Sequence, residues 1–256
     1  MLTSLYISPL ESCNLNCHYC YTKKTTNTLT NRQILGFVKR YKEYLLDSYF
    51  LILNSITLCG GEVFTLKNFP RLVNNLLKQG IFVTIITNGT IDQLDKISDP
   101  KNCQLLVSLD GPQEIHDKNR GKGNFDKSIK FINHARQLGF PTEIFFLITK
   151  DSYKYKDSFP KLLDLPVTYL TDRMGSLTPA QVLNIKQNYP TFPSKNFGCS
   201  QISLQSDGLV YGCCESPTSI GKLSDPIKKV IAKFLGSLTI CRQCIYWRSN
   251  AFFGAQ

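Results

Sequence analysis

The sequence contains no long hydrophobic segment. Nowhere in its 256 residues do about 18 apolar residues follow one another without interruption, the length that a membrane-spanning helix requires. The N-terminus also lacks the basic segment, apolar segment and small-residue cleavage site that together make a signal peptide. We therefore expect a soluble cytoplasmic protein without a membrane partner.

Acidic residues are scarce as well. The chain has 19 Asp and Glu against 30 Lys and Arg, which gives a formal net charge of +11. A basic protein suggests a nucleic-acid partner, but the sequence has no arginine-rich tract and no basic stretch interleaved with aromatic residues. The scattered basic residues indicate a solvated, lysine-rich surface instead, and they disfavour nucleic-acid binding. An anionic substrate or partner is the alternative.

Cysteine, by contrast, is abundant and unevenly placed. Ten cysteines occur, and most of them fall into two groups near the two ends of the chain. In a secreted protein such a content would suggest disulfides, but grouped cysteines without a signal peptide indicate metal ligation in a reducing compartment. For Cys59 and Cys103, which lie between the groups, we expect small buried side chains.

Apolar segments of strand length alternate with amphipathic segments of helix length. We expect strands near residues 5–7, 56–59, 81–86, 104–109, 142–148 and 165–170, and helices near residues 31–47, 68–79, 91–97 and 125–138 and from residue 176 onward. This alternation predicts an α/β protein whose parallel strands are joined by right-handed crossovers. In such folds the chemistry gathers at the carboxyl ends of the strands, so the polar and glycine motifs that follow the strands are candidate site residues.

Three cysteines, Cys13, Cys17 and Cys20, follow the first predicted strand at a Cys-x3-Cys-x2-Cys spacing. A tetrahedral zinc site needs a fourth ligand, and His18 is wedged between two of the three with little freedom to turn inward. A cuboidal iron-sulfur cluster has four irons, so three thiolates leave one iron open to an exogenous ligand. The spacing therefore predicts a cluster that does chemistry. A partial metal knuckle or three buried thiols is the alternative.

This cysteine loop, with the aromatic Tyr19 directly before its last cysteine, closely resembles the signature of the radical S-adenosylmethionine (SAM) superfamily. The resemblance implies a [4Fe-4S] cluster whose open iron is chelated by the amine and carboxylate of SAM. It further implies reductive cleavage of SAM to a 5′-deoxyadenosyl radical, and a reductant such as flavodoxin or ferredoxin. The fold that it implies is a partial (β/α)6 barrel with parallel strands.

Two strand-end motifs extend the resemblance. Gly60, Gly61 and Glu62 follow their strand directly, and glycines let the backbone turn sharply and approach a ligand closely. In radical SAM enzymes this motif binds the SAM amino group, so the resemblance implies that role for all three residues. Thr87 and Asn88, which follow the next strand, are expected to line the same cavity.

The stretch that begins at Ser108 closely resembles a block typical of radical SAM proteins with a C-terminal SPASM or Twitch extension. The resemblance implies that Ser108 and Arg120 bind the SAM carboxylate, for which a hydroxyl donor and a forked guanidinium are well suited. The alternative for Arg120 is a surface ion pair with Asp117 or Glu114. His116 and Asp117 are expected to hold this loop together rather than to act as acid and base.

The C-terminal part is predicted to be a second, smaller domain. A stretch around residues 189–194 with two prolines indicates a linker, so we expect a core domain over residues 1–190 and a second domain over residues 191–256. Alternating residues on both sides of Asp207 and Gly208 predict a β-hairpin with a tight turn.

Four cysteines of this second domain, Cys199, Cys213, Cys241 and Cys244, are candidate ligands of a second metal site. The arrangement resembles the Twitch extension, a small β-hairpin and helix unit, and implies an auxiliary [4Fe-4S] cluster in which every iron has a protein ligand. Cys214 is the alternative to Cys213, and a structural zinc site is the alternative to the cluster.

Taken as a whole, the resemblance implies a radical SAM oxidoreductase that modifies a C–H bond of a peptide or protein, with the auxiliary cluster as electron acceptor. Only 12 residues precede the cysteine loop, where peptide-modifying relatives often carry a leader-binding domain. A small-molecule substrate, an amino-sugar or cyclitol alcohol, is therefore the alternative. A further alternative is a zinc or iron-sulfur RNA-binding module without catalysis. Only the basic charge supports this alternative, and it does not explain the strand-end motifs.

Overall fold

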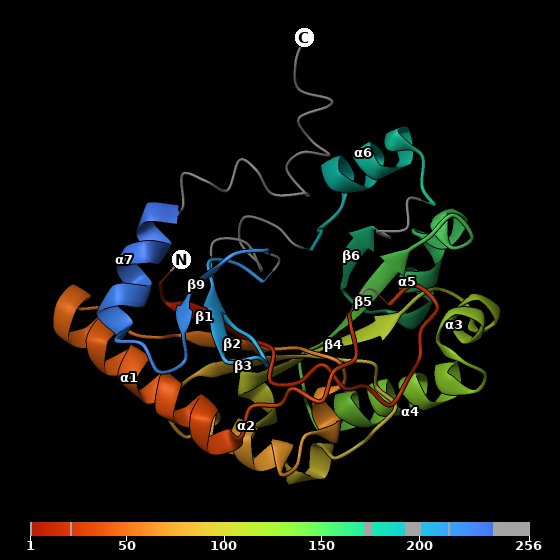
Figure 1. Ribbon diagram of the computed structural model, residues 1–256. Coiled ribbons are helices and arrows are strands. Elements are labelled where there is room, and N and C mark those ends of the chain that lie inside the picture. Colours follow the sequence, from red (N-terminus) through yellow and green to blue (C-terminus); the bar gives the residue numbers. More distant parts are fainter. Residues whose placement is uncertain (1, 21, 172–175, 193–200, 215, 238–256) are drawn as a thin grey trace.

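The first strand lies inside one continuous sheet rather than at its edge (Figure 1). The computed structural model describes residues 2–20, 22–171, 176–192, 201–214 and 216–237. Within these residues nine strands pair in the order β6-β5-β4-β3-β2-β1-β7-β8-β9. Strands β1 to β7 pair in parallel with their neighbours, whereas β8 and β9 are added in antiparallel orientation. The predicted α/β class and its six parallel strands are confirmed.

The strands are β1 (Ser4–Ile7), β2 (Ser55–Leu58), β3 (Phe82–Thr87), β4 (Cys103–Leu109), β5 (Thr142–Ile148), β6 (Val167–Thr171), β7 (Ile202–Leu204), β8 (Leu209–Tyr211) and β9 (Ser219–Lys222). The helices are α1 (Asn31–Tyr49), α2 (Phe69–Leu77), α3 (Gln113–Arg120), α4 (Asn124–Gln137), α5 (Ser158–Leu163), α6 (Pro179–Asn188) and α7 (Ile227–Ser237). Single 3-10 turns are η1 (Val63–Thr65), η2 (Leu94–Lys96), η3 (Pro100–Asn102) and η4 (Tyr153–Tyr155). Of the described helices, none is both long and apolar enough to cross a membrane.

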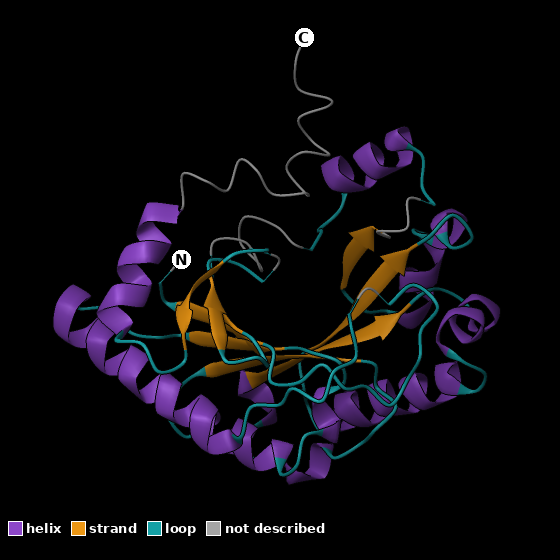
Figure 2. Ribbon diagram, in the orientation of Figure 1, coloured by secondary structure: helices purple, strands orange, loops and turns teal. Residues whose placement is uncertain are grey.

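Helices α1, α2 and α4 cover the convex side of a curved sheet (Figure 1 and Figure 2). The sequence of α1 shows how this layer forms. The helix begins with a capping box, because the Thr30 hydroxyl accepts from the Gln33 backbone N–H and the Gln33 side chain accepts from the Thr30 backbone N–H. Its buried side chains recur at helical spacing and join the main core: Ile34, Phe37, Val38, Tyr41 and Leu45.

The concave face of the sheet carries side chains in bands. Residues two apart on a strand point to the same face. Toward the carboxyl ends, an apolar cluster separate from the main core is formed by Tyr6, Ile86, Leu106, Phe145 and Phe192. Two residues earlier on β3 to β6 lie polar side chains that hydrogen-bond across the strands: Thr84, Gln104, Glu143 and Thr168. The concave face is therefore apolar near the strand ends and polar further down.

Two local predictions differ from the structure. The helix expected over residues 91–97 is reduced to the single turn η2, because Asp92 Oδ1 accepts the Leu94 N–H at 3.0 Å and favours a turn. Residues 113–120, expected to be a loop, form α3 instead. This helix starts directly after Pro112, whose carbonyl accepts the first helical N–H groups, and it ends at Gly121, whose φ of +100° does not continue a helix.

The predicted hairpin is present and belongs to the same sheet as the core. Strand β7 pairs with β1 along Leu5 and Ile202, and β8 then turns back on β7 through Asp207 and Gly208. Gly208 has a φ of +77°, which suits the tight turn. The described residues between 201 and 237 therefore extend the core sheet and its helical layer. The division into domains 1–190 and 191–256 stays a prediction.

Candidate functional site

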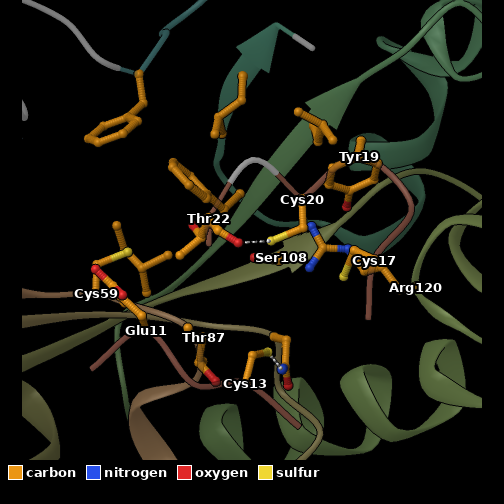
Figure 3. Close-up of a pocket in the computed structure, with 18 of the residues that line it drawn as sticks. Glu11, Cys13, Cys17, Tyr19, Cys20, Thr22, Cys59, Thr87, Ser108 and Arg120 are labelled. Carbon is orange, nitrogen blue, oxygen red and sulfur yellow. Dashed lines mark hydrogen bonds between the residues drawn. The ribbon is translucent and has the colours of Figure 1, made fainter. Parts of the chain in front are cut away.

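The predicted site residues converge on one cavity at the carboxyl ends of the strands (Figure 3). The cysteine loop follows β1, and the motifs after β2, β3 and β4 meet it there. Ten of the predicted residues line this cavity: Cys13, Cys17, Tyr19, Cys20, Gly60, Gly61, Thr87, Asn88, Ser108 and Arg120. Glu62 does not line it. The sequence pattern therefore located the site but not the orientation of every side chain.

The two glycines of the strand-end motif allow the cysteine loop to pack directly on the end of β2. The Gly61 N–H donates to the Leu10 carbonyl at 3.0 Å, and the Glu62 N–H donates to the Ser12 carbonyl at 3.0 Å. A Cβ on Gly61 would lie 1.9 Å from the Ser12 carbonyl oxygen, and one on Gly60 would lie 2.5 Å from that of Leu10. Glycine is required at both positions because backbone, not a flexible side chain, occupies the space.

The Glu62 side chain is fully buried and ties two strand ends together. Its carboxylate accepts hydrogen bonds from the Thr87 hydroxyl at 2.8 Å, the Asn88 N–H at 2.8 Å and the Phe64 N–H at 3.1 Å. Burial raises the pKa of Glu62, and these three donors oppose that shift. The Glu62 side chain therefore shapes the cavity from behind, and the role of Glu62 in binding the SAM amino group stays a prediction.

The first half of the cysteine loop is anchored to the end of β3. Asn14 Nδ2 donates to the Thr90 hydroxyl at 2.8 Å, and Asn88 Nδ2 donates to Asn14 Oδ1 at 3.0 Å. Asn88 Nδ2 also lies 3.8 Å from the Cys13 sulfur, and the Leu15 N–H lies 3.4 Å from it. Amide donors therefore surround the first thiol, where a thiolate would accept them.

The second half of the loop is anchored by Asp110, a residue that the sequence analysis did not select. Asp110 is fully buried, and its Oδ1 lies 3.0 Å from both Nε and Nη2 of Arg120. Its Oδ2 accepts the Tyr19 hydroxyl at 2.6 Å. The predicted alternative, a surface ion pair of Arg120 with Asp117 or Glu114, is wrong. Asp110 directly follows β4, and that position was the available signal.

The pair of Arg120 and Asp110 is electrostatically strong. Burial lowers the pKa of Arg120, but the charge and hydrogen bond of Asp110, together with Tyr19 and Cys17, raise it by more in total. Burial also raises the pKa of Tyr19, so its phenol keeps the proton that it donates to Asp110. The guanidinium stays close to the loop, with its centre 5.6 Å from the Tyr19 ring centroid.

His116 and Asp117 lie on α3 and hold the structure behind the cavity, as predicted. Burial lowers the pKa of His116 to about 4, and its Nδ1 accepts the Asp110 N–H at 3.4 Å. The Asp117 carboxylate accepts the N–H groups of Gly123 and Phe125, each at 2.8 Å, at the start of α4. Neither residue lines the cavity among the residues that the structure describes.

The cysteine loop suits a cluster better than a single ion. Among the described residues, no three His, Cys, Asp or Glu side chains gather closely enough to hold one metal ion. A cuboidal cluster spreads its thiolates over different irons, so Cys13, Cys17 and Cys20 need only face a common cavity, and they do. Burial raises the pKa of Cys13 and of Cys17, a cost that iron binding would have to offset.

The second cysteine group is described only in part. Cys213 is buried after β8, and Cys214 packs against the apolar cluster of the concave face. Cys199, Cys241 and Cys244 lie outside the described residues. The four-cysteine site, and the choice between Cys213 and Cys214, stay predictions.

Comparison with known proteins gives the family. A model of the radical SAM superfamily matches residues 7–163, which include the cysteine loop and every strand-end motif of the cavity. The chain belongs to the radical SAM superfamily. Its members use a [4Fe-4S] cluster and SAM, and the site residues fit both groups. The alternative of a metal-binding module without catalysis is therefore disfavoured.

Curated relatives match part of this radical SAM protein. Fe-coproporphyrin III synthase of Methanosarcina barkeri is 28% identical over 158 residues, which cover 60% of this chain and 38% of the relative. Sporulation killing factor maturation protein SkfB of Bacillus subtilis is 28% identical over 152 residues, or 56% of this chain and 35% of the relative. The matches thus span less than two fifths of these relatives.

Solved structures share the fold over nearly the whole chain. Native anSMEcpe with bound AdoMet has a TM-score of 0.71 at 20% identity, covering 96% of this chain and 87% of that chain. SuiB of Streptococcus suis bound to S-adenosylmethionine has a TM-score of 0.72 at 16% identity, covering 96% and 71%. At these identities the likeness concerns the fold, an α/β sheet curved into a partial barrel.

Proposed function

We propose that this chain oxidatively modifies a C–H bond of a peptide or protein substrate. Four observations on other proteins support this substrate class. SkfB is a maturation protein, and a cysteine-type anaerobic sulfatase-maturating enzyme of Clostridium novyi is 29% identical over 178 residues. Similar folds have been solved with the Cp18Cys peptide and with the precursor peptide SuiA.

The observation that carries the proposal is the single cavity in which the cysteine loop meets the ends of β2, β3 and β4. Cys13, Cys17 and Cys20 would bind three irons of a [4Fe-4S] cluster. When bound, this cluster and SAM supply a 5′-deoxyadenosyl radical that can abstract a hydrogen atom from an unactivated carbon.

Residues at the strand ends would hold SAM. Gly60 and Gly61 expose backbone close to the thiols, where the SAM amino group can approach. The Ser108 hydroxyl lines the cavity and makes no hydrogen bond to another described residue, so it is available to the SAM carboxylate. Arg120 uses Nε and Nη2 for Asp110 and presents its guanidinium to the same cavity.

One part of the cavity wall is apolar, and this favours a peptide side chain over a polyol. Beyond the thiols and strand-end groups, the described lining includes Ile86, Phe145, Leu147, Leu170 and Phe192, beside the polar Glu11, Thr22, Lys24 and Thr171. An amino-sugar or cyclitol alcohol would leave several hydroxyl groups without partners against such a wall, and each would cost about 1–3 kcal/mol. An aliphatic or aromatic side chain would instead gain from burial there.

We further propose that Cys199, Cys213, Cys241 and Cys244 hold an auxiliary [4Fe-4S] cluster that accepts the electron left on the substrate. A flavodoxin or ferredoxin is the proposed external reductant. The grouped cysteine pattern supports the first proposal, and the superfamily's need for a reductant supports the second. Analysis of iron and zinc in anaerobically reconstituted protein would distinguish about eight irons from about four irons plus zinc.

Activity can be tested on a peptide library in which one central position is varied over all residue types. Reconstituted enzyme, SAM and dithionite should yield 5′-deoxyadenosine and peptides that have lost hydrogen, mainly where the varied residue is apolar. Cys17→Ala should abolish both products. Cys103→Ala is the matched control, because Cys103 is a buried thiol at the opposite end of its strand and should leave both unchanged. SAM cleavage with oxidation of amino-sugar alcohols but of no peptide would contradict the proposed substrate.

A further inference from the structure

The cysteine loop is held by two separate sets of contacts, one for each half. The half around Cys13 is fixed by Asn14, Asn88 and Thr90 at the end of β3. The half from Cys17 to Cys20 contacts a different part of the chain, the end of β4 and the end of α3. No described hydrogen bond joins the two sets directly, so each can be weakened without removing the other.

We infer that Asp110 is the positioning residue for this second half. Both of its oxygens are used, Oδ1 by Arg120 at 3.0 Å and Oδ2 by the Tyr19 hydroxyl at 2.6 Å. The carboxylate is fully buried, and the Arg120 side chain is 10% exposed. Tyr19 lies between Cys17 and Cys20 in the sequence. The hydrogen bond from Tyr19 to Asp110 therefore sets the direction in which the side chains of both cysteines point from the loop.

A backbone contact reinforces the same arrangement. The His18 N–H donates to the Asn119 carbonyl at 3.1 Å, at the residue before Arg120. The last turn of α3 therefore meets the loop at two consecutive residues, Asn119 through this hydrogen bond and Arg120 through the Tyr19 ring. The contact of Arg120 depends on Asp110, whereas that of Asn119 depends on the position of α3 itself.

Asp110 is needed at this buried position because its negative charge balances the positive charge of Arg120. A buried guanidinium without a partner is strongly destabilised, whereas a hydrogen-bonded buried pair keeps a fixed geometry. Asp110 thus fixes Arg120 at the cavity and, through its second oxygen, fixes Tyr19 relative to Arg120. The direction of the two cysteine side chains and the position of the guanidinium therefore depend on the same carboxylate. Its benefit for cluster and SAM binding rests on the proposed function.

The loop contacts can be tested in the full-length protein before reconstitution. Rates of iodoacetamide alkylation would be measured for each cysteine by mass spectrometry. Tyr19→Phe removes one hydroxyl and leaves the buried ion pair intact. It should raise the rate of the half-buried Cys17 about tenfold while sparing Cys13, as loss of a charge-assisted hydrogen bond implies. Cys20 is exposed in the wild type and should react at an unchanged rate. Asp110→Asn should have the same or a larger effect.

Two further variants make the contrast specific. Thr90→Val removes the hydroxyl that accepts from Asn14, so it should raise the rate of Cys13 and spare Cys17 and Cys20. Asp117→Asn, on the same helix as Arg120 but facing α4, should leave all three rates unchanged. An unchanged rate of Cys17 in Tyr19→Phe would overturn the inference. Equal acceleration of Cys13 and Cys17 in that variant would also overturn it.

Reconstituted protein supplies the readout that a merely structural role would not change. Tyr19→Phe should retain wild-type iron content, with a lowered thermal midpoint because one oxygen of the buried Asp110 loses its donor. It should show a weaker change in the electron paramagnetic resonance spectrum of the reduced cluster on addition of SAM, with about tenfold lower SAM affinity. A wild-type response in this variant would contradict the positioning role. If wild-type protein itself binds iron but shows no response to SAM, the proposed function fails while the alkylation contrast still decides the role of Asp110.

Discussion

The carboxylate of Glu62 accepts the backbone N–H of Asn88 at 2.8 Å, which joins the turn after β2 to the end of β3. Both oxygens of this buried group face donors, since Thr87 and Phe64 donate to the other one. The Glu62 side chain therefore stabilises the wall of the cavity at the ends of β2 and β3.

Replacing Glu62 should destabilise this wall. In Glu62→Gln the side-chain amide would place one N–H group against the Asn88 N–H, so a buried donor would lose its acceptor. We expect the free energy of unfolding to fall by about 1–3 kcal/mol, measured by urea denaturation. Glu43→Gln on the exposed face of α1 is the control, and its side chain is 58% exposed. Equal stability of the two variants would contradict the assigned role of Glu62.

A methyl group on Gly61 should displace the cysteine loop. Because its Cβ would overlap the Ser12 backbone, Gly61→Ala should lower the thermal midpoint and reduce iron retention after reconstitution. Gly36→Ala on α1 meets only the flexible end of Arg40, at 3.9 Å, and should be neutral or stabilise by up to about 1 kcal/mol. The comparison needs a thermal melt and an iron assay. Wild-type values for Gly61→Ala would mean that the contact with Ser12 is not required.

His116 should make the protein less stable in mild acid. Burial lowers its pKa to about 4 from 6.5, so below pH 6.5 the unfolded chain binds a proton that the folded chain does not. The stability contribution is therefore complete above pH 6.5 and is lost as the pH falls toward 4, up to about 3 kcal/mol. Urea denaturation at several pH values should show a shallower loss in His116→Phe than in the wild type.

His134 provides the internal control for that pH dependence. It is half-buried at the surface and pairs with Asp92 at 2.7 Å, and this hydrogen bond raises its pKa. Its contribution has the opposite sign, because it is present at low pH and is lost as the pH rises. His134→Gln should therefore not reduce the loss of stability in acid. If it did so as strongly as His116→Phe, the buried histidine would not be the cause.

Asp117 should contribute to stability as the cap of α4. Asp117→Ala removes the acceptor for the N–H groups of Gly123 and Phe125, and we expect a loss of about 1 kcal/mol by urea denaturation. The pKa of Asp117 is lowered by these bonds despite partial burial, so the contribution should disappear as the pH falls below its ordinary range. Asp126→Ala, in the first turn of the same helix, tests whether charge alone explains the effect. A similar loss in both variants would argue against specific capping.

Local sequence patterns were sufficient for the order of the six core strands and for the place of the site. The apolar strand segments, the capping residue Thr30 and the turn at Gly208 each act within a few residues, and the structure has the expected elements there. The three cysteines and the strand-end motifs gave the cavity, because parallel strands bring their carboxyl ends to one edge. The helix predicted over residues 91–97 was wrong because a local hydrogen bond, from the Leu94 N–H to the Asp92 side chain, favours the turn η2.

The sequence by itself determined which residue types reach the cavity, because strand periodicity and motif spacing are local properties of the chain. Only the tertiary structure decided which of them face the cavity and which face each other. Tyr19 and Asp110 are 91 residues apart, and Glu62 and Asn88 are 26 residues apart. Such pairings depend on the register and curvature of the assembled sheet. No pattern along the chain encodes the direction in which a buried carboxylate finds its donors.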